Sequence, residues 1–147
     1  MRLIIVSVFL LLITAPVAGQ NITGTWKRIS STLEYQDGKK EDLHKAVLAG
    51  FPCARDMQFI FKADGTHYSQ SSKGCETINA MSKATWKQTG NTLTLVSVKE
   101  TEANPGGTRY TLTFSGNTVT LTHIYTEAEN KGVGIKVKKL VLVYKRI

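Results

Sequence analysis

Short segments in which apolar and polar residues alternate, separated by turn signals, run through most of this chain. The turn signals recur roughly every ten residues, a spacing typical of β-sandwiches and up-and-down β-barrels. The clearest are Asp37-Gly38, Asp64-Gly65, Gly90-Asn91 and Gly116-Asn117. The longest connection, residues 99–108, has no pattern of a crossover helix, so a parallel sheet is disfavoured. The sequence therefore predicts an all-β fold built from consecutive antiparallel hairpins.

The N-terminal segment has the pattern of a secretory signal peptide. Met1-Arg2 is a short basic start, Leu3 to Ala15 is almost continuously apolar, and Val17-Ala18-Gly19 offers small residues for cleavage. The apolar run is shorter than the about 20 residues of a membrane span, which leaves an uncleaved anchor helix as the less favoured alternative. No cysteine follows to carry a lipid anchor. We expect a signal peptide at residues 1–19, one secreted or periplasmic domain at residues 20–147, and no transmembrane segment after signal removal.

One helix is expected after the first strand. Residues 43–49 place apolar side chains at helical spacing, Glu41-Asp42 precede them and suit the helix dipole, and Gly50 ends the pattern. The polar segment Glu127–Gly134 is predicted to be a turn.

The strands place aromatic and aliphatic side chains on one face. A cavity wall and a filled core share this pattern, because a small barrel can fill its interior with side chains. The predicted inward residues are Met57, Phe59, Phe61, Tyr110, Leu112, Phe114, Val119, Leu121, Tyr125, Val141 and Val143. The candidate ligand-binding residues are Phe59, Phe61, Tyr110, Leu112, Phe114, Leu121, His123 and Tyr125.

Histidines and cysteines are the natural candidates for chemistry. His123 shares its alternation with Leu121 and predicts either a polar contact to a ligand or an ordinary hydrogen-bonded histidine. His44 lies on the predicted helix and is expected to face solvent. Cys53 and Cys75, two cysteines in an exported chain, predict a disulfide. Two thiols without a histidine pair would make a poor zinc site, so we expect no metal and no cofactor.

Catalysis and nucleic-acid binding have little support in the sequence. The chain has no Gly-x-Ser-x-Gly motif and no free cysteine once the disulfide forms, so it is not predicted to be an enzyme. The net charge of +8 is spread along the chain, and its densest part is a strand with alternating lysines, which solvates an outer face or blunts a sheet edge. Attraction to anionic envelope surfaces is the functional alternative, and export argues against nucleic acid. These basic residues are Lys136, Lys138, Lys139, Lys145 and Arg146.

The start of the first strand, Gly24-Thr25-Trp26, predicts the closed end of a barrel. Glycine lacks a Cβ and lets another part of the chain approach, and the tryptophan buries a large ring while its N–H needs a partner. With these residues, several motifs resemble, in order and spacing, the lipocalin-like domain of small secreted bacterial proteins. They are Gly24-Thr25-Trp26-Lys27, Cys53, Phe59–Thr66, Cys75, Trp86, Gly90–Leu95 and Tyr144-Lys145-Arg146.

This resemblance implies a single antiparallel up-and-down β-barrel of about eight strands that holds one small ligand. It also implies a structural closure in which Arg146 covers Trp26 beside Gly24. The start of the chain is similar to intracellular fatty-acid-binding proteins as well. However, those proteins lack a leader, carry a helix pair, and hold the fatty-acid carboxylate with an Arg-x-Tyr motif, whereas this chain has Leu142-Val143-Tyr144.

Two functions follow from the sequence. The first is the binding of a small apolar or amphiphilic ligand inside the barrel. The alternative is a filled barrel that acts through its surface, as an inhibitor or a cell-envelope interaction module.

Overall fold

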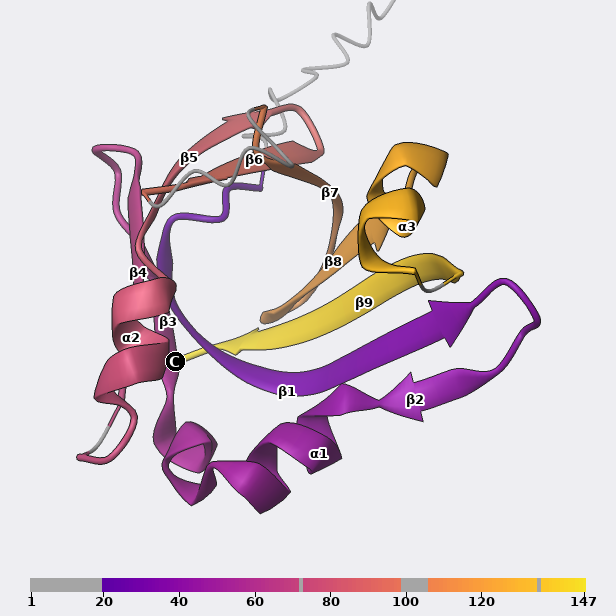
Figure 1. Cartoon of the computed structure of the whole chain (residues 1–147). Helices are drawn as coiled ribbons and strands as arrows, with labels where there is room; N and C mark the ends of the chain where they lie inside the picture. The colour runs from indigo at the N-terminus through magenta and orange to yellow at the C-terminus, as the bar shows by residue number, and fades with distance from the viewer. Residues whose placement is uncertain (1–19, 72, 99–105, 135) are drawn as a thin grey trace, which may run out of the picture.

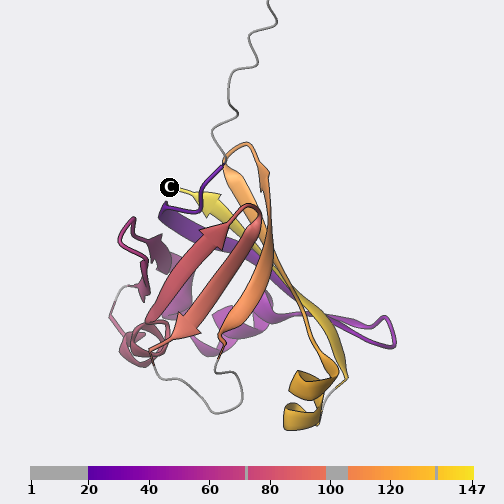
Figure 2. The same ribbon diagram turned by 90° about the horizontal axis from the view of Figure 1, so that it is seen from above.

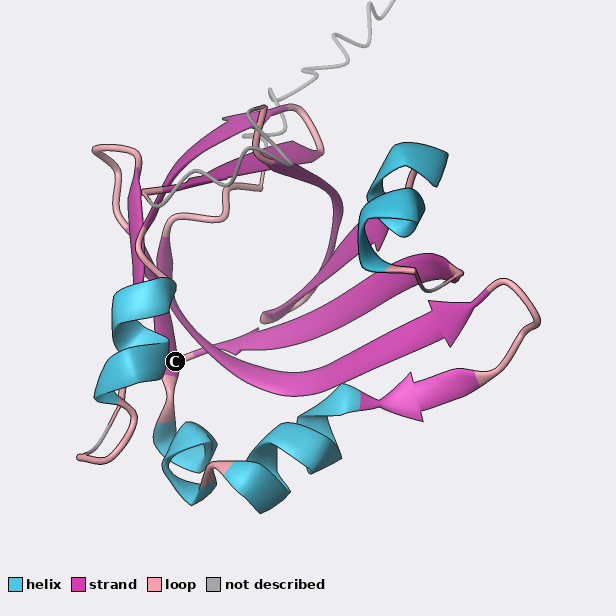
Figure 3. Cartoon of the chain, viewed as in Figure 1, coloured by secondary structure: helices cyan, strands magenta, loops and turns pink. Residues whose placement is uncertain are grey.

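The computed structural model describes residues 20–71, 73–98, 106–134 and 136–147, so the predicted signal peptide and most of the connection 99–108 lie outside the described residues. The fold is dominated by strands, and the helices lie around the outside of the sheet (Figure 3). In chain order the elements are β1 (Gly24–Tyr35), β2 (Lys40–Asp42), α1 (Leu43–Gly50), the 3-10 helix η1 (Pro52–Asp56), β3 (Gln58–Phe61), β4 (Thr66–Gln70), α2 (Glu76–Met81), β5 (Ala84–Thr89), β6 (Thr92–Ser97), β7 (Thr108–Ser115), β8 (Thr118–Ile124), α3 (Glu127–Val133) and β9 (Val137–Arg146).

Eight strands close into an antiparallel barrel (Figure 1). The order runs β1-β3-β4-β5-β6-β7-β8-β9, and β9 pairs back onto β1. The described strands therefore form a closed cycle and not an open sheet. The short β2 is an extra strand that pairs with the last part of β1. The prediction of an all-β barrel of about eight strands, with a short helix after the first strand, is confirmed.

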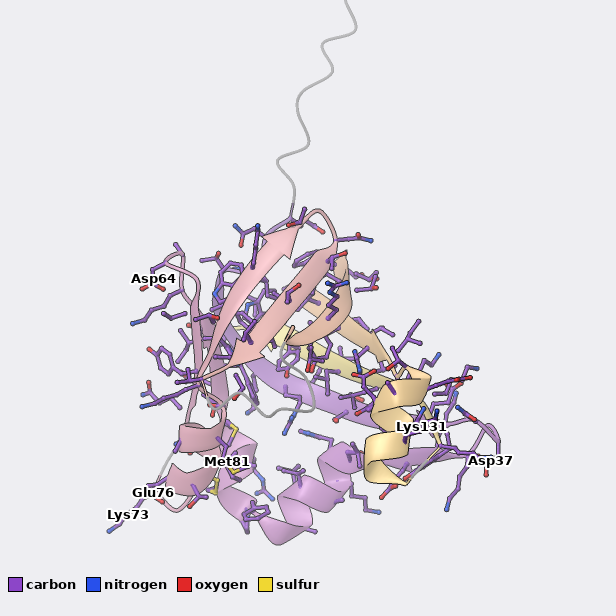
Figure 4. The ribbon with its side chains drawn as sticks, turned by 45° about the horizontal axis from the view of Figure 1, so that its top comes forward. Asp37, Asp64, Lys73, Glu76, Met81 and Lys131 are labelled. Atoms are coloured by element: carbon purple, nitrogen blue, oxygen red, sulfur yellow. A yellow bond between two sulfur atoms is a disulfide. The ribbon has the colours of Figure 1, made fainter. Side chains whose placement is uncertain are left out.

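The two ends of the barrel differ because hairpin turns and longer connections alternate along the chain. The tight turns after β3, β5 and β7 share one end, here called the hairpin end. There Gly65, Gly90 and Gly116 adopt φ values of 83°, 58° and 57°, which favour glycine. The opposite end, here called the helical end, carries α2 between β4 and β5 and α3 between β8 and β9. Figure 2 shows the helices gathered away from the C-terminus, and Figure 4 shows Asp64 of the first hairpin far from Met81 of α2.

The described residues contain more helices than the single helix that the sequence predicts. The segment 127–133 is helix α3 and not the predicted turn, because Thr126 and Glu129 form a reciprocal capping box at its start. Gly134, at φ 67°, ends this helix in the left-handed conformation. Helices α2 and η1 also lie outside the expectation of a single helix.

A β-bulge in β1 reverses its alternation. The register against β9 shifts between Arg28 and Ser30, and Ile29 is 45% exposed. Before the bulge, Trp26 and Arg28 share the inward face. After the bulge, Ser31 lies on the inward face and pairs with buried Leu142. The extra residue of a bulge shifts every later side chain to the other face.

The predicted inward face of the last strand is wrong. Leu142 and Tyr144 are 8% and 6% exposed and belong to the core, whereas Val141 and Val143 point to the other face and are only partly buried. This strand is apolar on both faces, so its own alternation does not specify a register. Pairing with β8 does, since Leu142 lies opposite Leu121.

The predicted disulfide between Cys53 and Cys75 is confirmed. It joins η1 to the start of α2, with Cα atoms 5.9 Å apart. Cys75 is buried in the core, and Val47, Leu48 and Ile78 pack against that core from α1 and α2. The bridge therefore holds two helical connections against the same side of the barrel.

His67 should make the stability of the protein sensitive to acid. It is buried, stacks on Phe61 with ring centroids 4.3 Å apart, and places Nδ1 3.1 Å from the carbonyl oxygen of Ile60. Burial lowers the pKa of His67 from 6.5 to about 4, although the bond to Ile60 opposes the shift. Protonation therefore favours the unfolded chain. Stability is fully present above pH 6.5 and falls towards pH 4, by about 3 kcal/mol for this group.

Urea unfolding at neutral pH and near pH 4.5 measures this effect. His67→Gln should lose about 2–3 kcal/mol less stability between the two pH values than the wild type. An equal loss in both proteins would contradict the assignment to His67.

Within the described residues, no helix is long and apolar enough to cross a membrane. The same residues contain no group of three or more His, Cys, Asp or Glu side chains arranged to hold a metal ion.

Candidate ligand-binding site

Strands β7 and β8 separate from each other at the helical end of the barrel. They pair with each other from Ser115↔Thr118 as far as Thr111↔Thr122. The β7–β8 pairing ends there among the described residues, although Tyr110 still pairs with β6 and His123 with Leu140 of β9. The wall of the barrel therefore opens beside Tyr110 and His123.

A hollow of about 510 Å³ lies at this opening. Its walls combine the separating strands with the first turns of α3 and the glycines that precede β7. Both inward-facing and outward-facing residues of the strands line it, as expected where a barrel wall parts. The lining residues are Thr92, Gly106, Gly107, Arg109, Tyr110, Thr111, Thr122, His123, Ile124, Thr126, Ala128 and Glu129.

His123 bridges the opening. The residue is 7% exposed, with Nδ1 2.8 Å from the carbonyl oxygen of Arg109 and Nε2 3.0 Å from Oε1 of Glu129. A carbonyl oxygen can only accept, so Nδ1–H donates to Arg109. Nε2 on the other side of the ring contacts the Glu129 carboxylate. One side chain thus ties β8 to both β7 and α3.

Glu129 is held in its ionised form. Burial alone would raise its pKa, but hydrogen bonds from Thr126 and the interaction with His123 outweigh burial and lower the pKa of Glu129 below its usual value. The Asn130 side chain adds a second attachment of α3, because it accepts from the Val137 N–H at 2.8 Å and donates to the Val137 carbonyl at 2.9 Å. Helix α3 is therefore fixed to both strands that flank it.

Two tyrosines flank His123. The ring centroids of Tyr110 and Tyr125 lie 5.7 Å and 4.7 Å from the imidazole centroid. Burial raises the pKa of both phenols, so both hydroxyls stay protonated at neutral pH. This part of the site offers aromatic surface and neutral polar groups together.

The predicted ligand-binding residues fall into three levels of the barrel. Tyr110, His123 and Tyr125 lie together at the opening, and Leu112 and Leu121 are buried below them as a cross-strand pair. Phe59 is buried on the same interior surface, against Tyr144. Phe61 and Phe114 lie near the hairpin turns, away from the opening.

The hairpin end is occupied by Trp26, which is 1% exposed. Its Nε1 donates to the Ile22 carbonyl at 2.7 Å, and the Arg146 guanidinium lies 4.2 Å from the ring centroid. Arg146 also donates to the Thr23 carbonyl at 2.9 Å. A Cβ at Gly24, whose φ is 133°, would lie 2.7 Å from the Arg146 guanidinium, so the close approach requires glycine. Trp26 and Arg146 therefore close this end of the barrel.

Residues 22–141 match the lipocalin-like domain family. The chain belongs to this family. A search of curated proteins found no significant match, and a search of solved structures found none either.

The lipocalin-like domain also carries a partly buried, inward-facing charged residue that the sequence prediction missed. Arg28 shares the inward face of β1 with Trp26 and lies opposite Tyr144 in the register with β9. Its guanidinium carbon is 5.2 Å from the ring centroid of Phe59. The available signal was the shared parity of Trp26 and Arg28 within the predicted first strand.

Helix α1 forms part of the same side of the lipocalin-like domain. His44 was predicted to face solvent, but it is half-buried, and its Nδ1 is sealed from solvent without a hydrogen-bond partner in the described structure. Val47 and Leu48 follow three and four residues later, so all three share one helical face. That face packs on the barrel, which explains the error.

Proposed function

We propose that this lipocalin-like domain binds one small apolar or amphiphilic ligand inside its barrel, and that the ligand enters between β7 and β8. The supporting observation is the opening in the wall, where a hollow of about 510 Å³ lies beside Tyr110 and His123. Barrels of about eight strands are of a size that holds one small ligand, and the lipocalin-like family consists typically of non-enzymatic binding proteins.

The surface alternative has weaker support. Its basis is the basic charge and the helix near residues 43–49, but two lysines of the basic strand near the C-terminus are engaged within the molecule. Lys138 and Lys139 both contact Glu34, at 2.9 Å and 3.3 Å. Their charge is therefore partly neutralised and less available to a partner.

An exported location is part of the proposal. The fold and the Cys53–Cys75 bridge suit an oxidising compartment, because structural disulfides persist outside the cytosol. The apolar N-terminal segment remains a predicted signal peptide.

Native mass spectrometry of protein purified from its own host, with Nile red titration of delipidated protein, tests the binding function. We expect a bound small molecule and saturable fluorescence. A bare-chain mass together with no probe binding would overturn the proposal and favour the surface alternative.

Two surface variants test the route of entry. Ala128 is exposed on α3 and lines the hollow, so Ala128→Trp should slow Nile red association about tenfold by filling the opening. Ala80→Trp, on exposed α2 away from the lining, should leave the rate unchanged. Equal rates in both variants would exclude entry between β7 and β8.

A further inference from the structure

Arg28 is a partly buried cation on the inward-facing side of β1. On one side along β1 is Trp26, which is buried at the hairpin end, and across the sheet is Tyr144, which is buried as well. The guanidinium lies over Phe59, a third core residue. A cation in this position is unusual, since an arginine on a barrel strand is normally directed to solvent.

The hydrogen-bonding capacity of Arg28 is only partly used. The atom Nε is sealed from solvent and has no partner among the residues that the structure describes. The ion pairs found among the described residues join His123 to Glu129 and Glu34 to two lysines, and none includes Arg28. Buried donors are nearly always satisfied, so a sealed donor without a partner calls for an explanation.

Tyr144 supplies a second polar group at the same place. Tyr144 lies opposite Arg28 in the β1–β9 register, and burial raises the pKa of Tyr144 although the neighbouring Arg28 opposes the shift. The hydroxyl is therefore neutral and can serve as a donor. A guanidinium edge and a phenol hydroxyl are thus held together among apolar side chains.

These groups match a carboxylate. The fork of a guanidinium presents parallel N–H groups that two carboxylate oxygens accept in a bidentate contact. One guanidinium balances one negative charge, whereas a phosphate dianion would bring a second charge into a low-dielectric interior without a partner.

The position of Arg28 also indicates the direction of the ligand. On β9, Tyr144 lies opposite Arg28, and Leu140 lies opposite His123, four residues nearer the opening. Extended strand covers about 13 Å over that length. Leu121 and Leu142 lie between these levels, so an apolar tail would pass them on its way to the opening.

We propose that Arg28, with Tyr144, anchors the headgroup of the ligand, and that the ligand is an amphiphile with a single carboxylate and an apolar tail directed towards the β7–β8 opening. This inference rests on the proposed binding function. It places the cation on the first strand of the barrel. In the Arg-x-Tyr motif of fatty-acid-binding proteins the arginine lies two residues before the tyrosine, and that position in this chain is Leu142.

Dodecanoate and 1-dodecanol, which share a tail and differ in the head, test the anchor by displacement of Nile red at neutral pH. We expect the wild type to bind dodecanoate at least about tenfold more tightly than dodecanol. Arg28→Gln should weaken dodecanoate binding about 10- to 100-fold and change dodecanol binding less than about twofold, as for a charge-assisted hydrogen bond. Lys27→Gln is the matched control, because it removes one charge from the exposed face of the same strand.

Two further measurements distinguish ligand anchoring by Arg28 from a purely structural role. The ligand-free Arg28→Gln protein should melt within about 3 °C of the wild type, since Nε has no partner to lose and glutamine keeps an N–H donor beside Tyr144. Tyr144→Phe keeps the ring and should weaken dodecanoate binding about threefold to tenfold without affecting dodecanol.

Each other outcome is decisive. Equal affinity for dodecanoate and dodecanol would overturn the anchor and leave the binding function standing. Equal weakening of both probes by Arg28→Gln would show a packing role and also overturn the anchor. Tighter, Arg28-dependent binding of dodecyl phosphate would replace the carboxylate assignment with a phosphate one. If neither dodecanoate nor dodecanol binds the wild type, both the anchor and the proposed function fall.

Discussion

Trp26→Ala should lower the free energy of unfolding by about 3–5 kcal/mol, the largest effect expected of a single substitution in this domain. The ring is almost fully buried, its N–H donates to Ile22, and Arg146 covers its outer face. Truncation removes all three interactions and leaves a cavity at the hairpin end. Urea unfolding of both proteins, followed by circular dichroism, gives the difference.

Trp86→Ala is the matched control. Trp86 is only partly buried on β5, and its Nε1 is shared between the carbonyl oxygens of Lys62 and Thr66 at 3.0 Å each. Trp86→Ala should lower the free energy of unfolding by less than half as much as Trp26→Ala, because less apolar area is exposed to water. A loss below about 1 kcal/mol for Trp26→Ala would show that Trp26 does not close the barrel.

Reduction of the Cys53–Cys75 bridge should lower stability by about 3 kcal/mol and the melting temperature by about 10 °C. The two cysteines are 22 residues apart in the sequence, and opening that loop releases conformational freedom in the unfolded chain. Thermal unfolding with and without dithiothreitol measures the shift.

The double variant Cys53→Ser, Cys75→Ser controls for other effects of the reductant. It should start at the lower melting temperature and show no further response to dithiothreitol. An unchanged melting temperature of the wild type on reduction would exclude a stabilising bridge.

The barrel was predictable because its strands carry their own signals. Each hairpin combines alternation with a turn that needs glycine, as at Asp64-Gly65 and Gly90-Asn91, and both signals are local. The disulfide followed from cysteine count and compartment. The grouping of Tyr110, His123 and Tyr125 followed from alternation along β7 and β8, although the opening beside them did not.

The errors arose where local sequence does not decide the structure. The bulge at Ile29 has no distinctive sequence, and it reverses the faces of the second half of β1. The register of β9 depends on its partner β8, since β9 is apolar on both faces. By contrast, the capping box of Thr126 and Glu129 was visible as Thr-x-x-Glu and would have predicted α3. Arg28 was missed because charge on a strand normally indicates an outward position.

The pairing of β1 with β9 bears on how the protein folds. It runs from Trp26↔Arg146 to Tyr35↔Val137 and so joins the first strand of the barrel to the last. Contacts of such sequence separation are slow to form, because a long loop must close before they contribute. The barrel cannot close during synthesis on a ribosome until the final strand has emerged. A chain that ends before β9 would leave β1 and β8 with exposed edges, and such edges pair with other chains in aggregation.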